Sequence, residues 1–300
     1  MLGITILGNN SALPAHDRHP TAQLLTTPEH LLLFDCGEGT QMQLARYKIR
    51  RSKINYIFIS HLHGDHYFGL PGLLNSMGLQ GRTQDLHLFI PEKLKAILDL
   101  QFEAANAVLP FKIHFHFLEK EGVTLEEKKF KVSCFKVQHR IECWGFLFCE
   151  IKYPRKILPD QCTKHEIPSA FYERLHWGED YTNKNGEVIK NELVTKAAAP
   201  PKSYAYSADT IYDENMAAHI KEVSLLFHET TYLQIDEERA AARFHSTTKQ
   251  AAMIAKQANV KRLIIGHFSS KYDVLDEFEK EAREVFENCD LAIEGVTYLL

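Results

Sequence analysis

One stretch of this 300-residue chain decides its fold, and it reads His61-Leu62-His63-Gly64-Asp65-His66. It directly follows an apolar run, 54–60, whose length and composition are typical of a buried β-strand. Four residues that commonly bind metal ions therefore stand within six positions at the end of one strand. Imidazole and carboxylate groups together suit Zn²⁺ and similar cations, and Gly64 permits a sharp backbone path. The stretch predicts a metal site, against the alternative of a solvated turn with incidental histidines.

Further potential ligands also follow predicted strands, and they are His139, Asp209 and His267. One such residue after a strand is weak evidence, because an isolated histidine there is more often a cap or a surface residue. Together with the first four they make seven potential ligands. That number is enough for two ions that share one carboxylate.

Short β-rich runs alternate with helical patterns along the chain. The predicted strands are 3–7, 31–35, 54–60, 86–90, 112–118, 130–138, 145–151, 203–207, 224–228, 262–266 and 291–299, and the predicted helices are 40–51, 69–80, 92–106, 247–257 and 274–286. This alternation predicts a layered sheet protein of the α/β or α+β class. Between about 153 and 201 prolines are scattered and apolar runs are few, so we expect an inserted arm within a single domain that spans 1–300.

Composition excludes several other classes of protein. The chain has 35 Lys+Arg against 39 Asp+Glu, a formal net charge of −4, and 45% hydrophobic residues, which together are ordinary for a globular protein and exclude wholesale disorder. No apolar run is long enough for a membrane span, and the first residues do not resemble a signal peptide. None of the six cysteines forms a CxxC pair, so we expect reduced thiols and a cytoplasmic protein.

The potential ligands occur within longer motifs that resemble a known family. The HxHxDH stretch with a later His, Asp and His resembles the metallo-β-lactamase superfamily. The flanking segments resemble more narrowly ribonuclease Z, the tRNA 3′-processing endonucleases, in their short bacterial form. Those segments, which span nearly the whole chain in the family's order, are Gly8–Pro14, Phe34–Gln41, His228–Tyr232, Phe244–Thr248 and Gly266–Tyr272.

The resemblance implies a fold, a metal centre and an activity. It implies a four-layer αβ/βα sandwich with an inserted arm, two Zn²⁺ per subunit with Mn²⁺ as an alternative, and a homodimer. The activity implied is endonucleolytic removal of the 3′ trailer from tRNA precursors, which leaves a 3′-OH on the tRNA and a 5′-phosphate on the trailer. Two cations suit this reaction, because they activate water and neutralise charge at the phosphate.

The resemblance also implies a role for each motif residue. His61, His63 and His139 would hold one ion, Asp65, His66 and His267 the other, and Asp209 would bridge them. Asp65 would accept a proton, and Glu229 and His245 match positions that support the site and transfer protons. The sequence leaves open whether Glu229 only orients a histidine and whether His245 is catalytic.

The chain departs from the family's pattern in several places. The arm lacks a clear Gly/Pro-rich tip, and the stretch 153–201 has seven Lys+Arg and seven Asp+Glu, so it has no formal net charge. Lys271 stands where the family usually has arginine. The lysine keeps the positive charge but cannot form the two parallel hydrogen bonds that arginine makes with a phosphate. Ala208 stands where glycine is common, so the turn before Asp209 must tolerate a β-carbon.

A basic segment, 46–53, holds five Lys+Arg in eight residues and no acid. Met42, Ala45 and Ile49 are spaced to form one apolar face of the predicted helix 40–51, which would leave the basic residues on the other face. We expect that face to contact RNA phosphates, against the alternative of a solvated helix face. The candidate substrate-binding residues are Arg46, Lys48, Arg50, Arg51 and Lys271.

Three other functions are compatible with parts of this pattern. A metallo-β-lactamase-fold hydrolase can act on another phosphodiester or on an ester, since the fold does not fix the substrate. A metal-stabilised RNA-binding scaffold would not need an open site for two ions. In a redox protein with a di-iron centre we would expect glutamate at position 63, where this chain has His63.

Overall fold

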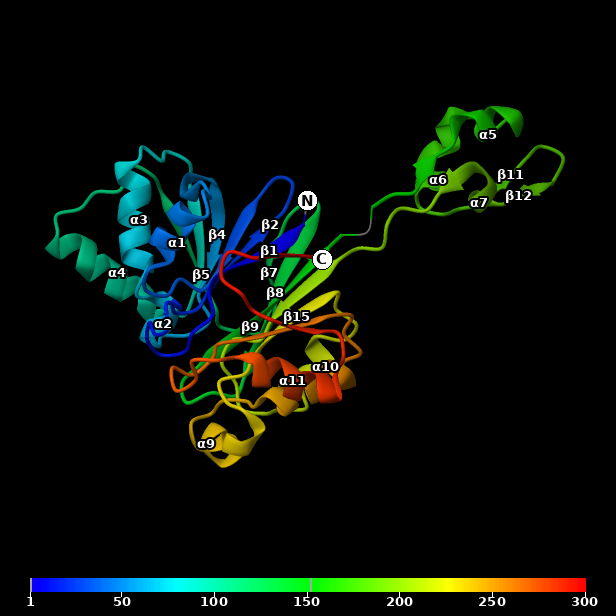
Figure 1. Cartoon of the computed structure of the whole chain (residues 1–300). Coiled ribbons are helices and arrows are strands. Elements are labelled where there is room, and N and C mark those ends of the chain that lie inside the picture. The colour runs from blue at the N-terminus through cyan, green and yellow to red at the C-terminus, as the bar shows by residue number, and fades with distance from the viewer. Residues whose placement is uncertain (1, 152) are drawn as a thin grey trace. The chain divides into compact units, whose positions relative to one another are not determined.

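The computed structural model describes residues 2–151 and 153–300, and they divide into two compact units. The smaller unit consists of Glu127–Lys131 and Cys149–Lys202, and it contains the stretch predicted as an arm. The larger unit contains the remaining described residues. Each unit is described by itself below (Figure 1).

Two seven-stranded sheets form the centre of the fold. In spatial order, the first sheet consists of β18 (Thr297–Leu299), β1 (Gly3–Gly8), β2 (Ala22–Thr26), β3 (Leu31–Phe34), β4 (Ile54–Phe58), β5 (Leu86–Ile90) and β6 (Ile113–Phe117). The second consists of β17 (Cys289–Leu291), β16 (Leu263–Gly266), β15 (Leu225–Glu229), β14 (Ser203–Tyr206), β9 (Cys143–Glu150), β8 (Phe130–Val137) and β7 (Gly122–Glu126). Strands β3 to β6 pair in parallel, as do β14 to β17.

Both faces of most of the parallel strands are buried, which explains their nearly continuous apolar sequences, whereas the edge strand β6 is partly exposed and alternates apolar residues with histidines. Successive side chains of a strand point to opposite faces. In β3 and β4, Leu33 and Ile57 pack in the core on one face, whereas the rings of Phe34 and Phe58 stack on the other, with centroids 5.1 Å apart. Phe34 also contacts the ring of Phe146 from the second sheet, so this aromatic layer lies between the two sheets.

Helices cover the outer face of each sheet (Figure 1). The first sheet shares a core with α1 (Thr40–Arg46), α3 (Leu70–Leu79) and α4 (Lys93–Ala104), and the second with α8 (Met216–His219), α10 (Thr248–Gln257) and α11 (Asp276–Val285). The short helices α2 (Gly64–Tyr67) and α9 (Glu237–Ala242) and the 3₁₀ turns η1 (Arg51–Lys53) and η3 (Gln234–Asp236) complete the larger unit. The layers therefore run helix, sheet, sheet, helix, which confirms the predicted sandwich.

The predicted helix 40–51 is wrong in its second half, because α1 ends at Arg46. Lys48 adopts a left-handed backbone with φ 57°, and the N–H groups of Lys48 and Ile49 bond to the carbonyls of Ala45 and Leu44. This is a Schellman end, which stops a helix. The predicted apolar face is also wrong, since the Met42 side chain is 62% exposed and Leu44 is buried instead.

The predicted strand 291–299 is two strands that belong to different sheets. β17 ends at Leu291, and β18 begins at Thr297 beside β1. Gly295, with φ 82°, turns the chain between them, and its N–H donates to the carbonyl of Ile6.

The smaller unit has secondary structure and a core of its own. Its elements are β10 (Lys156–Ile157), α5 (Pro159–Lys164), η2 (Ser169–Phe171), α6 (Tyr172–His176), β11 (Tyr181–Thr182), β12 (Val188–Ile189), α7 (Asn191–Val194) and β13 (Thr195–Lys196). Its core is formed by Cys162, Ile167, Leu175, Ile189 and Val194. Across the described part of the chain, no helix has the length and apolar character needed to cross a membrane.

Candidate metal centre

The HxHxDH stretch lies where β4 ends and α2 begins. His61 and His63 precede the helix, and Asp65 and His66 lie within it. A β-carbon at Gly64 would lie 2.2 Å from the ring of Phe68, so any other residue here would displace that exposed ring. The other three potential ligands follow β8, β14 and β16 in the second sheet, as their positions after predicted strands indicated.

Two of these turns have unusual backbone geometry. Ala208 and His267 both have φ in the left-handed region, at 54° and 62°. The turn before Asp209 thus accommodates the β-carbon that the sequence places there. Such strain persists only where the surrounding structure enforces it, and it is common next to functional groups.

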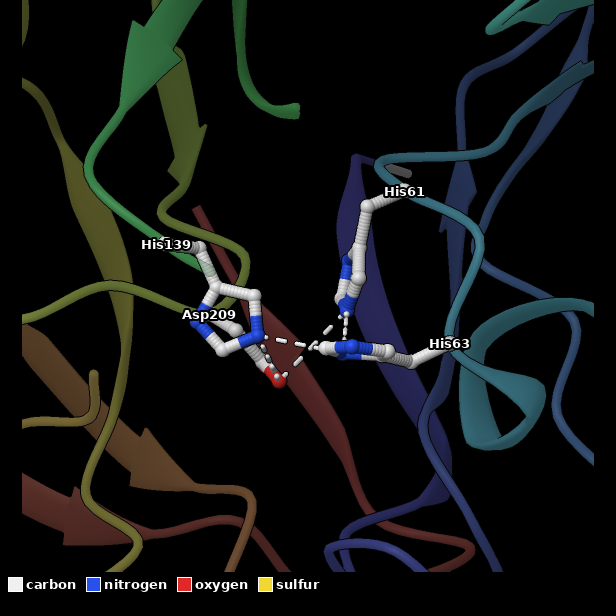
Figure 2. Close-up of side chains that lie close together, drawn as sticks. All are labelled: His61, His63, His139 and Asp209. Atoms are coloured by element: carbon white, nitrogen blue, oxygen red, sulfur yellow. Dashed lines mark hydrogen bonds and ion pairs between the residues drawn. The ribbon is translucent and has the colours of Figure 1, made fainter. Parts of the chain in front are cut away.

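The first group of potential ligands comprises His61, His63, His139 and Asp209, and Figure 2 shows their imidazoles and carboxylate converging. His61 Nε2 lies 3.0 Å from His63 Nδ1, and His139 Nε2 lies 3.1 Å from the same atom. Asp209 Oδ2 lies 3.7 Å from His61 Nε2. Three nitrogens and one oxygen therefore surround one small volume, in which a cation could bind.

The second group comprises Asp65, His66, His267 and again Asp209. His66 Nε2 lies 3.3 Å from Asp209 Oδ2, and His267 Nε2 lies 3.2 Å from Asp209 Oδ1. The two carboxylate oxygens of Asp209 thus face two histidines, and the residue belongs to both groups. The structure brings all seven sequence-predicted ligands together.

Unpaired nitrogen atoms show that the second group fits a metal ion. The Nε2 atoms of His66 and His267 are buried and have no hydrogen-bond partner among the described residues. A buried polar atom without a partner is costly unless a ligand or an ion satisfies it. A cation between these nitrogens and the carboxylates of Asp65 and Asp209 would satisfy both.

The electrostatics of the two groups favour the same conclusion. Burial, and next the proximity of His66, hold the pKa of His61 well below its usual value. Burial and then His139 lower the pKa of His63 to about 4. Both imidazoles are therefore neutral at pH 7, which is the form that binds metals.

His66 differs, because burial opposes its charged form but three carboxylates outweigh burial. Asp209, Asp65 and Asp35 together raise its pKa well above the usual value. Positive charge is thus strongly favoured at this position. A metal cation would supply that charge and leave His66 neutral.

Asp35 fixes the ring of His66 from behind. It is fully buried, and it accepts hydrogen bonds from His66 Nδ1 at 2.7 Å, from the Ser60 N–H and hydroxyl at 2.7 and 2.8 Å, and from the Tyr206 hydroxyl at 2.6 Å. Outer carboxylates of this kind orient a histidine so that its other nitrogen faces the metal. Asp35 was not among the residues predicted from the sequence, although an aspartate that ends an apolar strand is a usable signal.

Glu229 and His245 form a second supporting pair. Glu229 is fully buried at the end of β15, and its carboxylate accepts hydrogen bonds from His245 Nδ1 at 2.8 Å and from the Thr231 hydroxyl at 2.8 Å. The Thr231 hydroxyl in turn lies 2.9 Å from His267 Nδ1. Burial disfavours charge on His245, but Glu229 outweighs burial and raises the pKa of His245. Glu229 is therefore placed to orient His245 and, through Thr231, His267.

Three of the ligands line a hollow that adjoins a second one. The first, of about 290 Å³, is lined by Ser11, Ala12, His63, Gly64, Asp65, Phe68, Arg140, Asp209 and His245. The second, of about 390 Å³, shares Ser11, Ala12, Arg140 and His245 with the first, and we call it the arginine cleft. Its other lining residues are Leu13, Tyr232, Arg239, Arg243, Ser269, Ser270 and Lys271. Arg140, Arg239 and Arg243 were not predicted from the sequence, because Arg140 is distant in the chain from the other two and no motif contains all three.

The predicted substrate-binding residues do not form one surface. Lys271 lines the arginine cleft, where its ammonium bonds to Asp236 at 2.7 Å. Arg46 lines a separate hollow with the loop Pro14–His19. The remaining three are Lys48, Arg50 and Arg51, and no hydrogen bond or ion pair in the described structure connects them to the ligand groups. They lie after α1 and not on it.

Relatives of known name match almost the entire chain. A curated protein named Ribonuclease Z from Bacteroides fragilis is 41% identical over 293 residues, which is 97% of this chain and 96% of that protein. One of the same name from Parabacteroides distasonis is 38% identical over 295 residues, 98% of this chain and 97% of that protein. The chain belongs to the ribonuclease Z family. It is a hydrolytic endonuclease with the metallo-β-lactamase fold.

Solved structures and a family model agree with this assignment of the fold. The crystal structure of human tRNase Z, short form, superposes with a TM-score of 0.71 at 25% identity and covers 99% of this chain and 98% of its own. A long-form RNase Z from yeast reaches the same TM-score at 16% identity over 99% of this chain and 41% of its own. The family model described as anti-Pycsar protein Apyc1 matches residues 2–157, about half of the chain. The relatives named Ribonuclease Z match both halves.

Proposed function

We propose that this chain removes 3′ trailers from tRNA precursors by hydrolysis at a centre of two divalent cations. The observation that carries the proposal is Asp209, whose two oxygens join two complete groups of ligands in one open hollow. Membership of the ribonuclease Z family supports tRNA 3′ processing as the reaction.

The two groups of ligands support one arrangement of the ions. His61, His63 and His139 would hold one ion, Asp65, His66 and His267 would hold the other, and Asp209 would contact both. No thiol is among these donors, so Zn²⁺ and Mn²⁺ are both suitable. When bound, two such cations lower the pKa of water and neutralise charge that develops on the phosphate.

Asp65 is placed to receive a proton from the attacking water. Its Oδ2 accepts a hydrogen bond from the Ala12 N–H at 2.7 Å, which holds the carboxylate at the floor of the hollow. Burial favours its neutral form, but the nearby His66 and His267 outweigh burial and lower the pKa of Asp65. Asp65 is therefore a carboxylate that can orient water and accept its proton.

His245 is placed to protonate the leaving oxygen. Its Nδ1 donates to Glu229, so Nε2 is the ring atom left for a substrate, and the residue lines both hollows. A new P–O bond forms from water, and the bond from phosphorus to the ribose 3′-oxygen breaks. His245 gives that oxygen a proton, which leaves a 3′-OH on the tRNA and a 5′-phosphate on the trailer.

The decisive experiment is cleavage of a tRNA precursor with a 3′ trailer, with and without chelator, with both new ends mapped. We expect a metal-dependent cut after the nucleotide that precedes the trailer, with a 3′-OH and a 5′-phosphate. Hydrolysis of a small phosphodiester or ester without cleavage of any precursor would instead assign the centre to another substrate.

Replacement of Asp65 separates chemistry from binding. We expect Asp65→Ala to abolish cleavage and to leave precursor affinity within about threefold, since the RNA contacts lie elsewhere. The matched control is Asp99→Ala on α4, whose carboxylate pairs only with the nearby Lys95. Normal turnover by Asp65→Ala would contradict the assignment.

We also propose that the enzyme is a cytoplasmic homodimer in which the smaller unit of one subunit contacts tRNA that the other cuts. The resemblance to short ribonuclease Z enzymes supports the dimer and the arm. All six cysteines are free thiols in the structure, which supports a reducing compartment. Light scattering of the purified protein tests the dimer.

A further inference from the structure

The arginine cleft contains an excess of positive charge among the described residues. Arg140, Arg239 and Arg243 line it, and none of them forms an ion pair with a carboxylate among the described residues. Three arginines elsewhere in the chain do pair with acids, namely Arg174 with Glu179, Arg262 with Asp290 and Arg283 with Glu279. Three unpaired guanidinium groups beside a phosphodiesterase site favour an anionic occupant.

Two of these arginines are held on one side of α9. Arg239 lies in the helix and Arg243 caps its C-terminal end, four residues later, so both side chains emerge from the same face. The Arg239 guanidinium lies 5.7 Å from the ring centre of Tyr232, which restricts its orientation. A weaker attraction to Asp236 remains, although that carboxylate bonds to Lys271 and Tyr272.

The third arginine connects the cleft to the metal centre. Arg140 directly follows the ligand His139, and it lines both hollows. His139 Nδ1 donates to the carbonyl of Phe244 at 2.8 Å, and Phe244 directly follows Arg243. The walls that carry Arg140 and Arg243 are thus fixed to each other at the ligand itself. An anion in the cleft would lie at a defined position relative to the scissile phosphate.

The position of His245 indicates which side of the scissile bond the arginine cleft binds. If His245 protonates the leaving 3′-oxygen, the ribose that bears this oxygen lies on the His245 side of the metal centre. The arginine cleft adjoins the hollow of the metal centre at His245, together with Ser11, Ala12 and Arg140, and its volume of about 390 Å³ is suited to one nucleotide and too small for a duplex. The nucleotide on that side is the last one retained on the tRNA.

We propose that the arginine cleft holds the last nucleotide retained on the tRNA, and that Arg239 and Arg243 bind the phosphate on its 5′ side. This inference rests on the proposed function and specifies one subsite of it. Guanidinium groups suit the task, because they bind phosphate oxygens with two parallel hydrogen bonds. Arg140 lies nearer the metals and would contact the scissile phosphate or its neighbour.

A binding experiment tests the subsite without any turnover. The probes are the mature tRNA that ends at the retained nucleotide and the same tRNA shortened by that nucleotide, with the metal-loaded enzyme. We expect the wild type to bind the longer tRNA about tenfold more tightly, and Arg239→Gln with Arg243→Gln to remove most of this difference. The salt dependence of binding should also decrease by about 0.7 per lost phosphate contact. The matched control is Lys256→Met in the last turn of α10, which should change neither quantity.

A cleavage experiment then tests the direction along the RNA. Precursors carry one uncharged methylphosphonate linkage, either one position 5′ or one position 3′ of the scissile phosphate. We expect the 5′ methylphosphonate to lower the cleavage rate of the wild type about tenfold. In the double variant the same linkage should change the cleavage rate little, because the arginines that contact this phosphate are already absent. Coupling to the 3′ linkage instead would overturn the assignment to the retained nucleotide.

The failures of the subsite and of the proposed function give different results. If the wild type cleaves normally and the double variant has the same tRNA affinities and salt dependence, the subsite is wrong and the function stands. If the wild type cleaves no precursor and does not distinguish the two tRNAs, both are wrong.

Discussion

At the scale of single residues, the site depends on buried carboxylates that touch no substrate. Asp35 accepts four hydrogen bonds, including the one that fixes the ring of His66. Glu229 likewise accepts a hydrogen bond from Nδ1 of His245 and so fixes the orientation of its ring. Each carboxylate fixes which ring nitrogen faces the hollow, so the ligands are oriented before any ion arrives, and less ordering is required when one binds.

We expect Asp35→Asn to weaken metal binding by about 10- to 100-fold while the chain remains folded. The amide has the same shape, but one of its two positions donates and cannot accept from His66 Nδ1. The measurement is competition for Zn²⁺ against a coloured chelator. The matched control is Asp85→Asn, whose carboxylate bonds to His114 at the surface. Equal metal affinity in Asp35→Asn and the wild type would contradict the orienting role.

Some residues of the site could be predicted from the sequence and others could not. The seven ligands could be found, because four are adjacent in the chain and three follow apolar strands whose ends meet at one edge. Asp35 had one local signal, an aspartate at the end of an apolar strand, which did not reveal its partner. The arginines of the cleft could not be assigned, since nothing local distinguishes them from other surface residues. Their positions depend on how separate elements pack.

At the scale of elements, most predicted strands and helices were confirmed, for example α3 and α10 to within one residue at each end, whereas the end of α1 was not predicted. The strands β4, β5 and β16 are mostly buried on both faces, so their sequences are nearly continuous apolar runs, interrupted by Asn55 and His87. The end of α1 depends on the left-handed backbone of Lys48, and lysine is not a residue type that predicts this conformation. The prediction of one strand over 291–299 was wrong because the chain turns at Gly295. The residues before the turn belong to the second sheet and those after it to the first.

The Schellman end of α1 makes a prediction about stability. Lys48 has φ 57°, which costs a residue with a β-carbon about 1 kcal/mol relative to glycine. We therefore expect Lys48→Gly to raise the free energy of unfolding by about 0.5–1 kcal/mol, measured as a higher urea midpoint. Lys48→Ala is the matched control, because it removes the same charge and keeps the strain. Equal midpoints for the two variants would show that the backbone conformation contributes nothing.

The same pair of variants tests the basic segment. If Lys48 contacts RNA phosphates, both variants lose RNA affinity to the same extent, whereas only glycine changes stability. If neither variant affects RNA affinity or its salt dependence, Lys48 contributes no phosphate contact.

At the scale of the whole molecule, the metal centre joins the two sheets. His61, His63, Asp65 and His66 follow β4 of the first sheet, whereas the other three ligands follow strands of the second. Ions held by both sets therefore bridge the two halves of the sandwich. Without ions, two carboxylates of the second group lie together in a buried site, and protonated His66 compensates only part of their charge.

Metal removal should consequently destabilise the entire larger unit. An ion that binds only the folded chain stabilises it by about 2.7 kcal/mol at one hundred times its dissociation constant, which corresponds to roughly 5 °C in the unfolding midpoint. We expect a chelator to lower the midpoint by at least that amount and added Zn²⁺ to restore it. Asp209→Asn should abolish most of the metal-dependent shift, because this residue serves both groups, whereas Asp290→Asn, whose partner is Arg262 at the surface, should preserve it. Identical midpoints with and without metal would mean that the seven residues do not join the sheets through bound ions.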